Sequence, residues 1–187
     1  MLLSTCALKE LHRLGTAQGT VEHSIQEHVA YLARQIEVLK QQITDRIKSD
    51  PDLTIKRDLL KSIPGVGEAT VAAILAEFHM FETCDRVQKV VAFIGLAPRE
   101  FTSGSSIKGK PRLSKIGNAR LRKALFMPAL VSIQCNPVIQ AFYHRLKGKE
   151  KNGKVIVCAI MRKLVHLIFG ILKSGKPFDP NYAPYCA

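Results

Sequence analysis

The stretch Ile55–Phe78, which reads IKRDLLKSIPGVGEATVAAILAEF, contains the motif that decides the fold. Lys56–Ser62 reads as a helix, Ile63–Gly67 (IPGVG) as a tight turn, and Glu68–Phe78 as a second helix. This helix-hairpin-helix pattern predicts DNA binding, because glycine permits close approach of the backbone and the N–H groups that open the second helix can face a phosphate. The alternative is an ordinary turn between two packed helices. The candidate binding residues of the turn are Gly65 and Gly67.

Upstream of this motif, residues 25–43 carry a heptad repeat of apolar side chains. The steps between successive apolar positions alternate between four and three residues, which is the spacing of a coiled-coil seam. Residues 49–52 (SDPD) then provide a helix stop and a new start. We expect residues 1–54 to form a coiled-coil arm, which either makes the protein a homo-oligomer or packs on its own domain. The seam consists of Ile25, Val29, Leu32, Ile36, Leu39 and Ile43.

Downstream of the motif, helices are predicted over residues 86–94, 118–135, 137–146 and 155–172. Asn118 is placed to cap the second of these, and Gly175 to end the last one. The last helix is strongly apolar, which indicates burial at the centre of its domain. Residues 99–116 are polar, basic and rich in glycine, and are predicted to form a long loop. The fold class is therefore expected to be all-α, with a compact helical domain over residues 55–187.

The chain is strongly basic, and its charge is unevenly distributed. The formal net charge is +13 at pH 7. Residues 1–58 contain eight Lys/Arg and eight Asp/Glu (8 − 8 = 0), whereas residues 59–187 contain twenty and seven (20 − 7 = +13). Clustered cations bind nucleic acid by releasing the counterions that condense on phosphates, so DNA is the expected partner. A membrane-surface protein would need a cationic amphipathic helix, whereas these cations fall in segments punctuated by glycine and serine, so no membrane partner is expected.

The polar loop offers candidates for a nucleophilic serine. Ser103, Ser105 and Ser106 precede three cations that could bind a scissile phosphate and stabilise the charge that develops during its transfer. The residues alone do not distinguish among the three serines, and a merely flexible loop is the alternative. The expected contacts with nucleic acid in and after the loop, made to the backbone rather than to the bases, are those of Lys108, Lys110, Arg112, Lys115, Asn118, Arg120, Arg122 and Lys123.

A self-contained metal nuclease is not expected. Two-metal cleavage of a phosphodiester needs several convergent carboxylates, and the seven acidic residues after residue 58 show no spacing of a metal cluster. The five cysteines are scattered, without a CxxC pair. The sequence therefore predicts no metal site in this chain.

Several motifs, taken in order, resemble the insertion-sequence transposases that pair a RuvC-like DEDD domain with a C-terminal serine domain. The resemblance implies a DNA recombinase guided by a structured bridge RNA. It also implies that Ser103, the serine just before glycine, attacks the phosphodiester and forms a covalent phosphoserine intermediate. The motifs cover nearly the whole chain and are Ser62–Gly67, Phe93–Pro98, Thr102–Gly104, Gly117–Arg122, Asn136–Pro137, Ala141–Tyr143, Met161–Leu164 and Gly175–Pro180.

In that family the acidic metal ligands lie in an N-terminal domain, which a coiled coil joins to the serine domain. This sequence begins at the coiled coil, so we expect it to lack the acidic domain, to bind no cofactor itself, and to need that domain and its Mg²⁺ for strand transfer. The competing interpretation is a non-catalytic helix-hairpin-helix module that binds DNA. A DNA glycosylase would leave the later motifs unexplained. The sequence shows neither a signal peptide nor about 18 uninterrupted apolar residues, which predicts a cytoplasmic protein.

Overall fold

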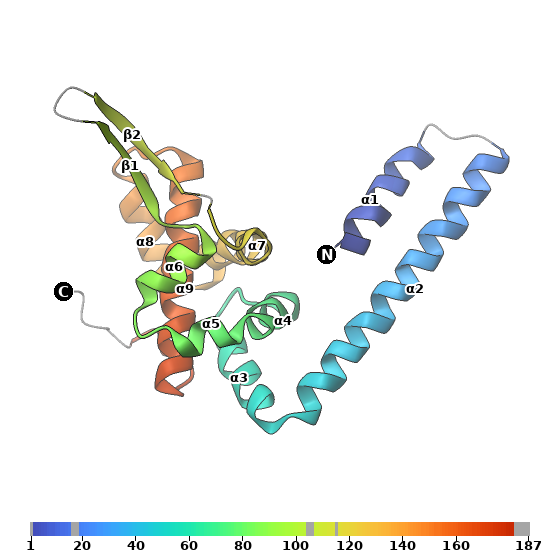
Figure 1. Cartoon of the computed structure of the whole chain (residues 1–187), viewed down its shortest axis with the longest axis horizontal. Helices are drawn as coiled ribbons and strands as arrows, with labels where there is room; N and C mark the ends of the chain where they lie inside the picture. Colours follow the sequence, from blue (N-terminus) through green and yellow to red (C-terminus); the bar gives the residue numbers. More distant parts are fainter. Residues whose placement is uncertain (1, 16–18, 104–106, 115, 182–187) are drawn as a thin grey trace. The chain divides into compact units, whose positions relative to one another are not determined.

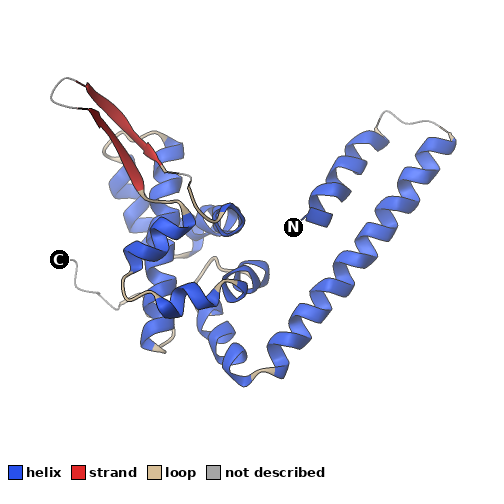
Figure 2. Ribbon diagram, viewed as in Figure 1, coloured by secondary structure: helices blue, strands red, loops and turns tan. Residues whose placement is uncertain are grey.

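The computed structural model describes residues 2–15, 19–103, 107–114 and 116–181, and it describes residues 2–4, 100–103 and 107–112 by their backbone (Figure 1). The chain divides into two compact units, Met1–Pro51 and Asp52–Ala187. The sequence analysis placed this boundary after residue 54. Helices dominate both units (Figure 2), so the all-α prediction is confirmed, with one two-stranded hairpin as the exception among the described residues.

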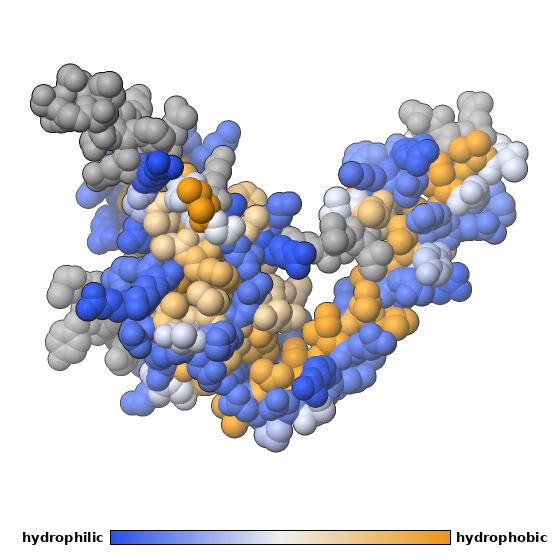
Figure 3. Space-filling model, in the orientation of Figure 1, coloured by the Kyte–Doolittle hydropathy of each residue, from blue (hydrophilic) through white to orange (hydrophobic). Residues whose placement is uncertain are grey.

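The first unit consists of α1 (Leu2–Leu14) and α2 (Thr20–Ser49), which pack against each other. By the rise of an α-helix, the 13 residues of α1 span about 20 Å and the 30 residues of α2 span about 45 Å. Along the predicted seam, Ile25 and Leu32 are buried, whereas Leu39 and Ile43 are 44% and 47% exposed. Figure 3 shows apolar side chains gathered along this unit. The chain therefore covers the first part of its own seam and leaves the second part open.

The second unit begins with the two predicted helices of the hairpin motif, α3 (Pro51–Lys61) and α4 (Glu68–Ala76). A proline at the first position suits α3, because the first N–H groups of a helix have no partner within it. α4 ends at Ala76 rather than Phe78, because Glu77 leaves the helical conformation and its N–H bonds back to the carbonyls of the last turn. A separate short helix, α5 (Phe78–Thr83), follows.

The core of the second unit is built around α9 (Gly153–Ser174), which packs against α5, α6 (Val87–Ile94), α7 (Ala119–Cys135) and α8 (Pro137–Lys147). The predicted burial of this last helix is confirmed. By length and composition alone α9 is a candidate membrane span, and α7 with α8, bent by 92°, is a candidate broken span. In this unit, α9 supplies the core with Ile156, Ile160, Met161, Leu164, Val165, Ile168 and Ile171.

The prediction of a long loop over residues 99–116 is wrong for most of its length. The chain forms a hairpin there, in which β1 (Pro98–Ser103) pairs with β2 (Ile107–Leu113) in antiparallel register and with an irregularity between Arg99 and Phe101. Serine, glycine and lysine gave the segment the composition of a loop, but antiparallel pairing satisfies its backbone N–H and C=O groups. Pro111 is tolerated because a sheet of two strands leaves one side of each strand unpaired.

Candidate nucleic-acid interface

Ser103 is the last residue of β1, in a hairpin that projects from the helical body of the second unit (Figure 1). The backbone register pairs Ser103 with Ile107 and Thr102 with Lys108. Lys108 therefore lies one register position from Ser103, on the opposite strand. The side chains of Ser103, Lys108, Lys110 and Arg112 lie outside the described residues, as do Ser105, Ser106 and Lys115 entirely.

Asn118 ties the base of the hairpin to the helical body. Its Oδ1 accepts hydrogen bonds from the N–H groups of Arg120 and Leu121, both at 3.0 Å, which confirms the predicted cap of α7. Its Nδ2 donates to Glu77 Oε1 at 2.7 Å, and its own N–H donates to the Phe93 carbonyl at 2.8 Å. Both ends of the Asn118 amide are thus engaged inside the fold, so its geometry assigns it to positioning α7; its predicted contact with nucleic acid stays a prediction.

The cations in the first turns of α7 fall into two groups. Arg122 is half-buried, and its Nη1 donates at 2.8 Å to the carbonyl of Ile94, the last residue of α6. A cation at this end of α6 also suits the negative end of its helix dipole. Arg120 and Lys123 are exposed. Of these three, Arg120 and Lys123 are therefore the ones whose charges are open to a phosphate.

Gly117 allows α7 to begin against α6. Its φ is +131°, a backbone conformation that residues with a side chain rarely adopt. A Cβ at this position would lie 2.1 Å from the carbonyl oxygen of Phe93. The contact is to backbone, which has no side-chain rotamer to change. The glycine is therefore required by the packing that orients the hairpin.

Gly65 and Gly67 have different roles in the turn between α3 and α4. Gly65 has φ +95°, and a Cβ there would lie 2.3 Å from Ser132 Oγ on α7, which itself donates to the Pro64 carbonyl at 3.2 Å. Gly67 precedes α4, is exposed, and would place a Cβ in open space. Gly65 thus serves the packing of the turn on α7, whereas no packing contact requires glycine at Gly67. Their predicted contacts with DNA stay predictions.

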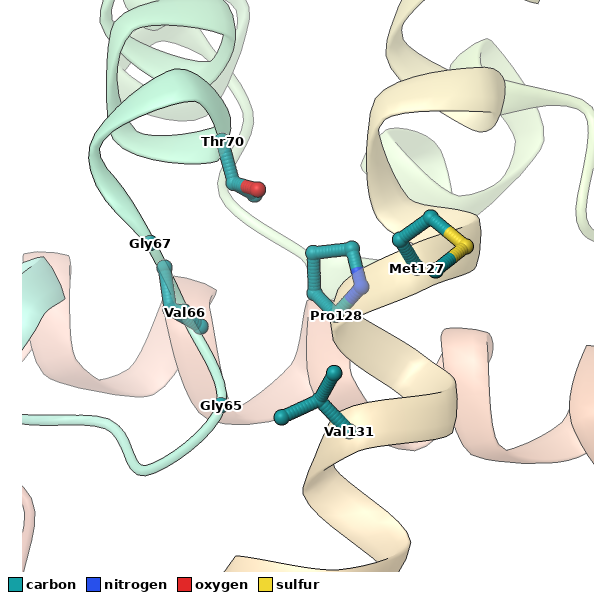
Figure 4. A pocket seen from close by; sticks show the side chains of 7 residues that line it. All are labelled: Gly65, Val66, Gly67, Thr70, Met127, Pro128 and Val131. Atoms are coloured by element: carbon teal, nitrogen blue, oxygen red, sulfur yellow. The ribbon is translucent and has the colours of Figure 1, made fainter.

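A shallow pocket of about 430 Å³ lies between this turn and α7 (Figure 4). Its lining carries no ionisable side chain. Met127 at its rim is 60% exposed. The lining residues are Gly65, Val66, Gly67, Thr70, Met127, Pro128 and Val131.

Glu68, which the sequence analysis did not single out, forms ion pairs with two cations beside the turn, Arg57 and Lys61. Glu68 Oε1 lies 2.7 Å from Arg57 Nη2 and 2.7 Å from Lys61 Nζ. Hydrogen bonds from Arg57, and then from Lys61, lower the pKa of Glu68 to about 2. The four-residue spacing of the two cations on α3 and the place of Glu68 in the first turn of α4 were visible signals of this cluster.

This cluster makes the stability of the unit dependent on pH. The pKa of Glu68 is lowered from its ordinary 4.5, so its contribution is present above pH 4.5 and is lost as the pH falls towards about 2. Because the carboxylate is exposed, we expect Glu68→Gln to cost less than about 1 kcal/mol at pH 7 and a smaller amount at pH 2, where the carboxylate is about half protonated. Urea unfolding at both pH values measures the difference. A variant that loses as much at pH 2 as at pH 7 would contradict this account.

Comparison with known proteins identifies the central part of the chain. Residues 57–144 match the family described as "Transposase IS116/IS110/IS902 family". The chain is 32% identical over 173 residues to the "Pilin gene-inverting protein" of Moraxella lacunata, covering 92% of this chain and 54% of that protein. It is 24% identical over 167 residues to the "Transposase for insertion sequence element IS1328" of Yersinia enterocolitica, covering 83% and 46%.

A third relative is the "Insertion element IS110 uncharacterized 43.6 kDa protein" of Streptomyces coelicolor, which is 26% identical over 121 residues, 65% of this chain and 30% of that protein. The chain spans about half the length of the curated relatives that it matches over most of its own length. The match of residues 57–144 covers nearly all of the helix-hairpin-helix motif. It also covers the β1–β2 hairpin that carries Ser103, which we call the serine hairpin, and the helices α4 to α7. In this part the chain is similar to the Transposase IS116/IS110/IS902 family.

Proposed function

We propose that the chain is part of an insertion-sequence recombinase, in which the second unit binds DNA and Ser103 supplies the nucleophile for strand cleavage. The observation that carries this proposal is the place of Ser103 at the end of a strand that projects from the body. A nucleophile must reach phosphorus in the backbone of a duplex, and a projecting strand provides that reach. The hydrogen bonds of Asn118 and Arg122 fix the base of the hairpin, which limits the positions that Ser103 can take.

In the proposed step, Ser103 Oγ forms a bond to phosphorus while the bond from phosphorus to a deoxyribose oxygen breaks. The serine proton passes to solvent, and the departing oxygen takes up a proton. Lys108, Lys110 and Arg112 belong to the opposite strand, and their cations would stabilise the negative charge that grows on the phosphoryl oxygens. The product is a phosphoserine link that retains the energy of the phosphodiester for joining to a second DNA end.

The Mg²⁺ that the family resemblance implies does not fit this part of the chain. Among the described residues, no three His, Cys, Asp or Glu side chains come together in a group that could hold a metal ion. We propose that strand transfer needs an acidic domain in addition to these residues. A structured guide RNA is the second nucleic acid that the resemblance implies.

Covalent trapping tests this function. The chain is incubated with DNA that carries the element ends, with and without a separately supplied acidic domain, Mg²⁺ and guide RNA, and is then denatured. A protein–DNA adduct that survives denaturation supports the recombinase. Binding that weakens with salt, with no adduct under any condition, would instead identify a non-catalytic DNA-binding module.

We also propose that the first unit dimerises through the open part of its seam. Leu39 and Ile43 share the heptad face of α2 and are about half exposed, which is unfavourable for apolar side chains in water. Since each is already about half buried, completing its burial contributes roughly half of the 1.5–3 kcal/mol of a fully exposed side chain, and a dimer gains this for both residues in each of its two copies. A second copy of α2 presents the same spacing and is the simplest partner for this face.

Replacing Leu39 and Ile43 together by glutamate is expected to raise the dissociation constant of the dimer by at least about 100-fold, since each loss of 1.4 kcal/mol is tenfold. Sedimentation velocity over a range of concentrations measures it. The matched control is Tyr31→Glu with Val38→Glu, which alters two equally exposed positions of α2 off the seam. If the two double variants weaken the dimer equally, or if neither weakens it, the contact does not run through the seam.

A further inference from the structure

The turn between α8 and α9 carries the densest group of cations among the described residues with side chains. Five Lys/Arg fall within residues 145–154, against one acidic residue, Glu150. All five are exposed, and no ion pair joins any of them to a carboxylate in the described part of the chain. We call this group the α8–α9 cluster, and it consists of Arg145, Lys147, Lys149, Lys151 and Lys154.

Three cations of the second unit, Lys56, Arg57 and Lys61, differ from this cluster because they already have carboxylate partners. Arg57 and Lys61 bind Glu68, and Lys56 binds both Asp52 and Glu82. Such pairs hold their charges in place without attracting a polyanion strongly. The α8–α9 cluster keeps its charges open to solvent, and that is the condition for binding phosphates by releasing their counterions.

Helix dipoles explain only the first half of the cluster. Arg145 and Lys147 lie in the last turn of α8, where cations stabilise the negative end of the helix. Lys151 and Lys154 lie just before or in the first turn of α9, which contains no acidic residue, and there they repel the positive end of the dipole, whereas Lys149 lies two residues beyond the end of α8. Cations at this end cost stability in the isolated protein, and a bound anion would offset that cost.

The turn is held in a defined shape. Successive backbone N–H groups of Gly148, Lys149 and Glu150 donate to carbonyls in the last turns of α8, at 3.0, 3.2 and 3.0 Å. Asn152 caps α9 by accepting a hydrogen bond from the Lys154 N–H at 3.0 Å. Two of the cations are steadied by aromatic rings, with Arg145 at 5.1 Å from the Phe142 ring centroid and Lys147 at 5.8 Å from that of Tyr143.

We propose that the α8–α9 cluster is a contact surface for the phosphate backbone of nucleic acid, additional to the serine hairpin. α9 begins at the end of the unit towards which the hairpin extends in the view of Figure 1. The chemistry is that of a regularly spaced polyanion, which duplex DNA and duplex RNA share. The inference rests on the proposed function in that it requires a nucleic-acid partner, but it does not depend on Ser103 being a nucleophile.

The test compares two variants of equal charge in the full chain. One replaces Lys147, Lys149, Lys151 and Lys154 by glutamine. The control replaces four exposed lysines elsewhere, so both net charges fall from +13 to +9 (13 − 4 = 9). Fluorescence anisotropy with 20-base-pair DNA and RNA duplexes gives the affinity as a function of salt. The control positions are Lys9, Lys48, Lys89 and Lys176.

On DNA, the plot of log K against log salt has a negative slope. The cluster variant is expected to make this slope shallower by about 3, and the control variant by less than about 1. If the cluster variant loses affinity for only one of the two duplexes, the result still supports the contact surface and identifies that nucleic acid as its partner. Equal losses in both variants, or an unchanged slope in the cluster variant, would overturn the inference. Failure of the unchanged chain to bind either duplex would overturn both this inference and the proposed function, whereas binding without a covalent adduct when the acidic domain, Mg²⁺ and guide RNA are supplied would count against Ser103 alone.

A variant of opposite sign guards against misfolding as the cause. Glu150→Gln removes the only carboxylate within residues 145–154 and is expected to tighten binding several-fold at low salt. A misfolded protein would not bind more tightly. Weaker binding by Glu150→Gln would overturn the assignment.

Discussion

A Ser103→Ala chain is expected to bind DNA as the unchanged protein does and to form no covalent adduct with it. The change removes the oxygen proposed to form the phosphoserine link and leaves the cations of β2 and α7 in place. Adduct formation should fall by at least about 1,000-fold, which is the scale for loss of a nucleophile that works as part of a unit. Labelled DNA on a denaturing gel measures the adduct, and anisotropy measures binding.

The two serines that follow provide the matched controls. Ser105→Ala and Ser106→Ala make the same chemical change within three residues of Ser103 and should keep most of the adduct. An adduct that persists in Ser103→Ala and disappears in one of these variants would move the nucleophile to that position. Parallel loss of binding and adduct in Ser103→Ala would point to a structural role instead.

Gly117→Ala is expected to lower the free energy of unfolding of the second unit by about 3 kcal/mol or more. The new Cβ would lie 2.1 Å from the Phe93 carbonyl oxygen and 2.9 Å from its carbonyl carbon, at a φ of +131°. Relief of this clash would break the 2.8 Å hydrogen bond from the Asn118 N–H to the same carbonyl. For a unit of this size the melting temperature should fall by roughly 6–12 °C, which thermal denaturation followed by circular dichroism would show.

Gly170→Ala is the matched control for this prediction. Gly170 lies within α9 and is exposed, and a Cβ there would meet nothing within 4 Å. Alanine in a helix interior is more favourable than glycine, so this variant should gain about 0.5–1 kcal/mol. If Gly117→Ala melts at the same temperature as the unchanged protein, Gly117 does not hold α7 against α6 in the way described.

The helices of the second unit could be predicted because local signals mark their ends. Asn118 and Asn136 cap α7 and α8 through their own side chains, and Pro137 follows at the first position of α8. Gly175 ends α9 in the left-handed conformation, as predicted. Each signal acts within a few residues, so a sequence read locally is enough to find it.

The positions that shape the candidate site could not be predicted in the same way, because their partners are far along the chain. The contact between Asn118 and Glu77 spans 41 residues, and that between Ser132 and Pro64 spans 68. Sequence alone assigned Gly65 and Asn118 to nucleic acid, which stays a prediction, and it did not reveal their packing contacts within the fold. The hairpin was missed because strand pairing depends on register between segments, which composition does not reveal.

The segment between Phe93 and Asn118 is closed at its base by the helical body rather than by its own strands. The Asn118 N–H donates to the Phe93 carbonyl at 2.8 Å, and within this closure the Ser114 N–H donates to the Ala97 carbonyl at 3.0 Å. Doubling the length of such a closed excursion costs only about 0.6 kcal/mol of chain entropy. A change in the length of this segment is therefore expected to cost the α-helical body little stability.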